Sequence, residues 1–206
     1  SIEDASMQMI EDEIGSHQYN EKEWPIVRRI IHSTADFDFA DKNKVIFHKD
    51  AIESGMNALK NGCSIVVDVN GVIGGLNKQN PKDFGNEIVC NISKPEMMEL
   101  AKKEGKTRSQ VSMRAAISDI NEGVVAIGNA PTALLEVIQM VKEGVVKPAL
   151  IIGTPVGFIC AAESKEELSK LEEVPFITNL GRKGGSSSSS AIINAIFKLI
   201  RAESTS

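Results

Sequence analysis

The residues of this chain that could carry chemistry gather in three loops rich in glycine and small polar side chains. These loops are 128–132, 153–157 and 181–186. Glycine lets backbone N–H groups approach a ligand closely, and a helix that starts at such a loop adds a partial positive charge. The third loop also carries Arg182 and Lys183, which suit a carboxylate or a phosphate. Turn geometry alone could explain any one of these loops, but three together favour a binding site.

A histidine in a predicted helix is the second candidate. Apolar residues recur at helical spacing over 21–35, and Arg28 and Arg29 precede His32 by four and three residues, on the same side of the helix. Two neighbouring cations disfavour a protonated imidazole, whereas an anionic ligand that neutralises them would let the ring take up a proton. The spacing therefore indicates a proton-handling histidine beside an anion site. The alternative is an ordinary solvated face of the helix.

Two further polar residues lie at predicted element ends. Arg108 opens a helix, where its guanidinium could clamp a carboxylate with two hydrogen bonds, although such an arginine is commonly just exposed. Asp68 ends a predicted strand, where an aspartate is often a turn former.

These residues need a scaffold that brings strand ends and helix starts together. Short β-branched runs alternate with helical patterns, and several runs are apolar throughout, which is typical of strands buried on both faces. The predicted strands are 45–47, 64–69, 87–91, 124–127, 149–153 and 174–178. Because parallel crossovers place helices on both faces of a sheet, the pattern predicts an α/β fold. We expect a three-layer, doubly wound, mainly parallel sheet with extra N-terminal helices over 2–14 and 21–35.

Helix-end signals and one biased segment complete this scaffold. The helix signals are Asp50 before 51–59, Pro131 opening a helix that closes near Gly144, and Ser164 with Glu167 as a capping box. Five serines, 186–190, stand between a strand and the apolar helix 191–200, where a flexible linker is not expected. Since ligands of open parallel sheets bind outside the carboxyl ends of the strands, the three loops should meet at one edge.

Composition bounds the class of protein. The chain has 206 residues, 42% of them hydrophobic and 25% charged, which is typical of a single globular domain over 1–206. A formal net charge of −5 argues against a nucleic-acid partner. Three scattered cysteines predict neither a disulfide framework nor a metal site, and favour a reducing cytoplasm. No apolar run approaches the roughly 20 residues of a membrane span, and the acidic N-terminus lacks a signal pattern.

Nucleotide and metal motifs are missing from the sequence. The segment 71–75 follows a predicted strand but lacks the GxGxxG spacing, and no GxxxxGK[ST] occurs. His17 and His48 have no carboxylate or cysteine neighbours at metal-ligand spacing, which favours surface positions for both. We therefore expect no metal and no nucleotide cofactor.

Four segments resemble the precorrin-8X methylmutase family, also called precorrin isomerase. They are RIIH at 29–32, AIGNAPTAL at 126–134, PVGF at 155–158 followed by AAESK at 161–165, and GR with GGS at 181–186. The resemblance covers nearly the whole chain, and its second and third segments are far more specific than any lone glycine-rich loop. The sequence departs from the family around 74–76, in its serine run, and at Lys106, which replaces an asparagine.

The resemblance implies a flavodoxin-like fold and a homodimer with active sites at the subunit interface. It also implies migration of a methyl group from carbon 11 to carbon 12 of a corrinoid, without an organic cofactor. In this family His32 would donate and accept the proton, while Ser6, Arg29 and Arg108 would contact the substrate. Further substrate contacts are expected from the loop residues Asn129, Thr132, Gly184, Gly185 and Ser186.

The chemistry of such a substrate fits the residues. A corrinoid of this stage carries several carboxylates, which suit arginines and helix N-termini, and the shift needs a rigidly held macrocycle and one well-placed proton. A non-catalytic corrinoid-binding protein and a flavin or phosphometabolite enzyme on the same fold are the alternatives. Nothing in the sequence distinguishes metal-free precorrin-8X, which gives hydrogenobyrinic acid, from its cobalt complex, which gives cobyrinic acid.

Overall fold

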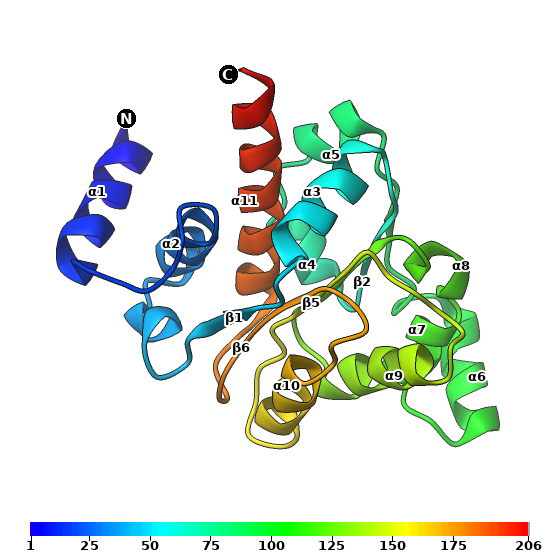
Figure 1. Ribbon diagram of the computed structural model, residues 1–206. Helices are drawn as coiled ribbons and strands as arrows, with labels where there is room; N and C mark the ends of the chain where they lie inside the picture. The colour runs from blue at the N-terminus through cyan, green and yellow to red at the C-terminus, as the bar shows by residue number, and fades with distance from the viewer. Residues whose placement is uncertain (206) are drawn as a thin grey trace.

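A six-stranded, mostly parallel sheet orders the molecule (Figure 1). The computed structural model describes residues 1–205. The strands are β1 (Val45–Phe47), β2 (Ile65–Val67), β3 (Ile88–Val89), β4 (Val124–Ile127), β5 (Leu150–Gly153) and β6 (Phe176–Asn179), in the spatial order β1-β6-β5-β4-β2-β3. Of these described strands, only β1 runs antiparallel to its neighbour. Counted from β2, the parallel strands have the order 2-1-3-4-5, which is the flavodoxin-like order and confirms the predicted fold class.

Helices cover both faces of the sheet and give the molecule three layers (Figure 1). The first face carries α1 (Ile2–Ile14), α2 (Glu23–Thr34), the 3-10 turn η1 (Phe37–Ala40), α3 (Ala51–Lys60), α4 (Asn70–Gly74), α5 (Gln79–Phe84) and α11 (Ser186–Ser204). The second face carries α6 (Pro95–Glu104), α7 (Arg108–Arg114), α8 (Ile117–Ile120), α9 (Pro131–Lys142) and α10 (Ala161–Ser169). α1 packs on α2, so the two N-terminal helices add to the sheet fold as expected.

Alternating side chains of the central strands divide the core between the two faces. In β4, Val124 and Ala126 belong to the apolar cluster under α2, α3 and α11, whereas Val125 and Ile127 belong to the cluster under α7, α9 and α10. Successive side chains of a strand point to opposite faces. Because both faces are covered, every residue of β4 is apolar and fully buried.

The serine run is part of a buried helix. α11 begins at Ser186, five residues before the predicted helix, and Ser188, Ser189 and Ser190 are at most 2% exposed. The Ser189 hydroxyl donates to the carbonyl of Ile127 at 3.0 Å, and the Ser190 hydroxyl donates to the carbonyl of Val72 at 2.6 Å. Small hydroxyls that find backbone acceptors therefore let the helix pack closely on the strand ends.

The predicted capping box at Ser164 and Glu167 is wrong. α10 begins three residues earlier, at Ala161, after Cys160 adopts a left-handed backbone conformation with φ of 66°. Ser164 lies inside the helix, and its hydroxyl donates to the Ala161 carbonyl at 2.8 Å. Burial of Ala161 and Leu168 determines the start of this helix, rather than the local capping pattern.

A close approach of two backbones makes Gly128 a sensitive position. A Cβ atom there would lie 2.8 Å from the Ser186 Cα atom and 2.9 Å from a Val72 methyl group. We expect Gly128→Ala to lower the free energy of unfolding by about 1–3 kcal/mol, because the start of α11 would have to move. Gly74→Ala is the matched control, since nothing lies within 4 Å of its Cβ position. Urea denaturation measures both, and equal stabilities of the two variants would contradict the close approach.

Candidate active site

The strand order reverses between β2 and β4, and a buried carboxylate lies at this point. Asp68 follows β2, is 1% exposed, and accepts hydrogen bonds from the backbone N–H groups of Gly128, Asn129 and Ala130 at 2.8, 2.9 and 2.8 Å. Burial raises the pKa of Asp68, and the three N–H donors act in the opposite direction. The N–H groups of this turn therefore bind Asp68, so a ligand has to use other groups of the same loop.

The other two glycine-rich loops meet this turn at the same edge of the sheet. Thr154, directly after β5, donates its backbone N–H to the Ile127 carbonyl at 2.8 Å and accepts the Gly185 N–H at 2.8 Å. Its hydroxyl also lies 2.8 Å from the Ser189 hydroxyl. These contacts join the ends of β4 and β5 to the start of α11, as the topology of a parallel sheet requires.

A first group of predicted site residues lies along this edge. The Thr107 side chain caps α7 by accepting the Gln110 N–H at 3.1 Å, and its hydroxyl lies 3.4 Å from that of Thr132 at the start of α9. The structure thus brings exposed Arg108 near Thr132. Asn129 is exposed in the neighbouring turn, and the Gly128 contact places Ser186, with Gly184 and Gly185 before it, beside that turn.

A second group lies on α1 and α2. Arg29 pairs with Glu3 at 2.6 Å, and Ser6, one turn after Glu3 on α1, is half-buried like His32. The pKa of Glu3 is lowered, chiefly by the hydrogen bond and charge of Arg29 and also by the nearby His32 ring. Arg28 likewise pairs with Glu11 of α1 at 2.7 Å. The two cations beside His32 are therefore already paired with carboxylates, which corrects the expectation of an unneutralised pair.

The two groups are separate within one chain. Arg29 lines a cavity of about 300 Å³ together with Lys198 and Arg201 of α11, whereas Ser186 begins that helix. Lys198 follows Ser186 by twelve residues on α11, which corresponds to about 18 Å along the helix. The structure therefore does not place Arg29 in contact with the Gly184–Ser186 loop.

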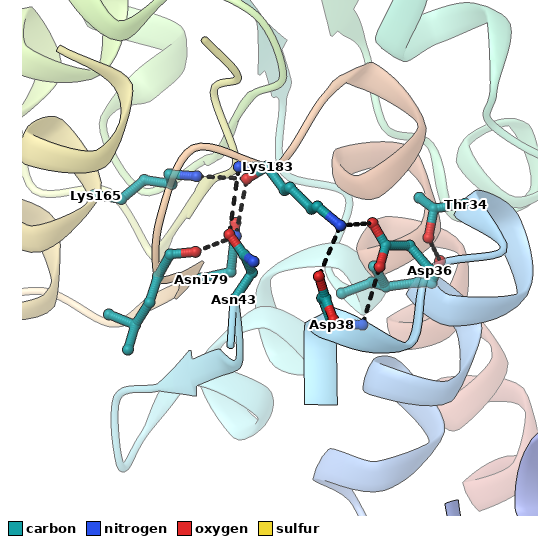
Figure 2. A network of polar contacts seen from close by, with 9 residues as sticks. Thr34, Asp36, Asp38, Asn43, Lys165, Asn179 and Lys183 are labelled. Atoms are coloured by element: carbon teal, nitrogen blue, oxygen red, sulfur yellow. Dashed lines mark hydrogen bonds and ion pairs between the residues drawn. The ribbon is translucent and has the colours of Figure 1, made fainter. Parts of the chain in front are cut away.

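Lys183 links the second group to the edge (Figure 2). Its ammonium lies 2.8 Å from carboxylate oxygens of both Asp36 and Asp38, which follow the helix that carries His32. Its backbone N–H donates to the Asn43 side chain at 3.5 Å. Lys183 was expected to serve an anionic ligand, but its charge is used inside the protein. Arg182, its neighbour, lies over the Phe158 ring at 5.4 Å.

A buried lysine donates a hydrogen bond to the same loop (Figure 2). Lys165 of α10 is fully buried, and its ammonium donates to the Lys183 carbonyl at 2.6 Å, an acceptor that it shares with the Asn179 amide at 2.9 Å. Burial lowers the pKa of Lys165 to about 8. Sequence reasoning missed this residue, although its spacing from Ala161 and Leu168 places it on the buried face of the helix.

A cavity larger than the one beside Arg29 lies elsewhere. It has a volume of about 680 Å³ and lies at the β1 edge between residues that include Ile14, His17, Tyr19 and Phe47. None of the predicted site residues lines it. The strand-end edge is favoured as the active site, because the reversal in strand order and the predicted polar groups coincide there.

Among residues 1–205, no helix combines the length and the apolar character needed to cross a membrane.

Comparisons with known proteins agree with this architecture. The sequence model of the precorrin-8X methylmutase family matches residues 1–199. A cobalt-precorrin-8 methylmutase of Priestia megaterium is 51% identical over 95% of this chain and 85% of its own length. A precorrin-8X methylmutase of Sinorhizobium is 34% identical over 95% of this chain and 92% of its own length. The crystal structure of the precorrin-8X methylmutase of Thermus thermophilus superposes with a TM-score of 0.88 at 35% identity, covering 98% of each chain.

Fold and comparisons together define an isomerase built on a three-layer α/β sheet. The chain belongs to the precorrin-8X methylmutase family. The resemblance found in the sequence is thereby confirmed.

Proposed function

We propose that this protein moves the methyl group on carbon 11 of cobalt-precorrin-8 to carbon 12, giving cobyrinic acid in cobalamin biosynthesis. Membership of the methylmutase family over nearly the whole chain is the observation that carries this proposal. We assign the cobalt-containing substrate ahead of metal-free precorrin-8X because the relative that is 51% identical has the cobalt compound in its name. Turnover of both compounds by the purified protein tests the assignment.

The site residues divide the work between binding and proton transfer. Arg108, Asn129 and Thr132, with the Gly184–Ser186 loop, offer donors to the carboxylates of the macrocycle from the strand-end edge. Arg29 would bind a substrate carboxylate by exchanging it for Glu3. The methyl group leaves carbon 11 and bonds to carbon 12 within one molecule, and substrate and product are isomers, so the protein has to hold the ring and supply one proton that it later takes back. We assign that proton to the His32 imidazole.

We further propose that the protein is a cytoplasmic homodimer whose partner subunit completes the site. Lys198, which lines a cavity with Arg29, and Ser186 lie about 18 Å apart along α11 within one chain. Large apolar side chains are exposed near both groups, with Ile2 at 88% on α1, and Phe158 at 85% and Ile159 at 83% before α10. Exposed apolar surface of this kind is typical of protein interfaces. The free cysteines, Cys63, Cys90 and Cys160, fit a reducing compartment.

Replacement of the proposed proton donor should separate binding from chemistry. We expect His32→Ala to lower turnover of cobalt-precorrin-8 about 100-fold or more, while cobyrinic acid still perturbs its visible spectrum with a Kd close to that of the parent protein. His48→Ala is the control, since this histidine contacts the Glu172 carbonyl far from the proposed site. Near-normal turnover by His32→Ala would remove His32 from the mechanism. Saturable binding without turnover by the parent protein would instead favour a corrinoid-binding protein.

Light scattering tests the proposed homodimer and should give a mass of about twice 22.3 kDa. Dilution below the dimer dissociation constant should reduce specific activity, because each site would lose residues of the partner. A monomer that turns over at the full rate would contradict the shared site.

A further inference from the structure

The buried ammonium of Lys165 has no carboxylate partner among the described residues. α10 packs against α9 and β6, and Lys165 contacts the loop after β6. The charged side chains on these elements are Glu136 and Lys142 of α9, Arg182 and Lys183 of the loop, and Glu163, Glu166 and Glu167 of α10 itself.

Each of the nearby acids is engaged elsewhere or faces solvent. Glu136 pairs with Arg114 at 2.6 Å and with a second cation, Lys106. The remaining acids are on α10 and are exposed. Glu167 pairs with Lys142 at 3.0 Å, and Glu166 pairs with Lys170 at 3.4 Å. Glu163 lies two residues before Lys165 and therefore faces away from it. Lys165 is thus left with one neutral acceptor, the Lys183 carbonyl.

An uncompensated buried charge is costly, and its position here has a consequence for the loop. Taking an ammonium out of water without a counter-charge is strongly unfavourable. A peptide group is planar and trans, so its C=O and N–H point in opposite directions. Lys165 and Asn179 hold the Lys183 carbonyl from the interior (Figure 2). The Gly184 N–H of the same peptide group therefore points away from them.

The start of α11 adds to the same positive potential. This helix has 19 residues, and the N-terminus of a long helix carries a partial positive charge. Within residues 1–205, the backbone N–H groups of Ser186 and Ser187 have no hydrogen-bond acceptor. The loop therefore presents N–H donors on its outer side. The charged ammonium of Lys165 lies on the opposite side of the peptide group that joins Lys183 to Gly184.

We propose that Lys165 is a positioning residue that supplies the buried counter-charge for a corrinoid carboxylate bound at the Gly184–Ser186 loop. The inference rests on the proposed function, since the methylmutase substrate and product are polycarboxylates. Lys165 does not touch the ligand. It orients the loop peptide and contributes long-range attraction, and the ligand provides the negative charge that the interior lacks.

The pH dependence of product binding tests this proposal. Lys165 loses its proton as the pH rises through about 8, so the attraction should be present below that pH and lost above it. Titration of the intact protein with cobyrinic acid, followed by visible absorption, should give a Kd that rises about tenfold between pH 7.5 and 9.5. Lys165→Met should bind about tenfold more weakly at pH 7.5, show no such rise, and converge with the parent protein at pH 9.5.

A control variant and steady-state kinetics separate this role from a purely structural one. Lys142→Met removes an exposed ion pair of α9 with Glu167 of α10 and should follow the parent protein at every pH. For Lys165→Met, the KM for cobalt-precorrin-8 should rise about tenfold while kcat stays within twofold, since the charge acts on substrate and product alike.

Two results would overturn the proposal. One is a Kd of the parent protein that is constant from pH 7.5 to 9.5, a measurement that needs no variant to fold. The other is wild-type affinity of Lys165→Met or Lys165→Gln at pH 7.5. If cobyrinic acid binds with the expected pH profile but cobalt-precorrin-8 is not converted, the proposed function fails while the role of Lys165 in binding stands.

Discussion

The geometry of the candidate site depends on one interaction, the binding of three consecutive backbone N–H groups by the Asp68 carboxylate. Without this acceptor, three donors of the turn after β4 would lack partners, and each of the two buried ones, the N–H groups of Gly128 and Ala130, would cost about 1–3 kcal/mol. This turn places Gly128 against Ser186 and thereby determines where α11 starts. The position of the Gly184–Ser186 loop therefore follows from a carboxylate at the end of a different strand, β2.

Charge is distributed unevenly over the proposed site. Around α1 and α2, Arg29 and Arg28 pair with acids of α1. Lys183 pairs with Asp36 and Asp38, which follow α2. Ligand carboxylates can reach these cations only by competing with internal partners. At the strand-end edge, the Lys165 ammonium is buried without a carboxylate partner among residues 1–205, so a ligand there would meet uncompensated positive charge. This difference favours initial capture of a polycarboxylate at the edge, followed by exchange at α2.

Much of the fold is predictable from local pattern, whereas the contacts of the site are not. The strand 124–127 is found with its observed ends because four apolar residues in a row require burial on both faces. The sequence predicts only a turn at Asp68, since its true partners come from the turn after β4, which is adjacent in space and about 60 residues away in the chain. Similarly, S-x-x-E at Ser164 satisfies a capping pattern, but α10 already begins at Ala161, where burial of Ala161 and Leu168 determines its start. The pairing of Arg29 with Glu3 depends on how α1 docks, which no spacing within α2 encodes.

Amide hydrogen exchange of the intact protein, with and without saturating cobyrinic acid, tests the central claim that the ligand joins the strand-end edge to the helix of His32. We expect slower exchange in peptides that cover 128–132, 181–187 and 28–34, with smaller changes elsewhere. Protection confined to the residues around the 680 Å³ cavity near Tyr19 and Phe47, with unchanged exchange at the edge, would contradict this assignment.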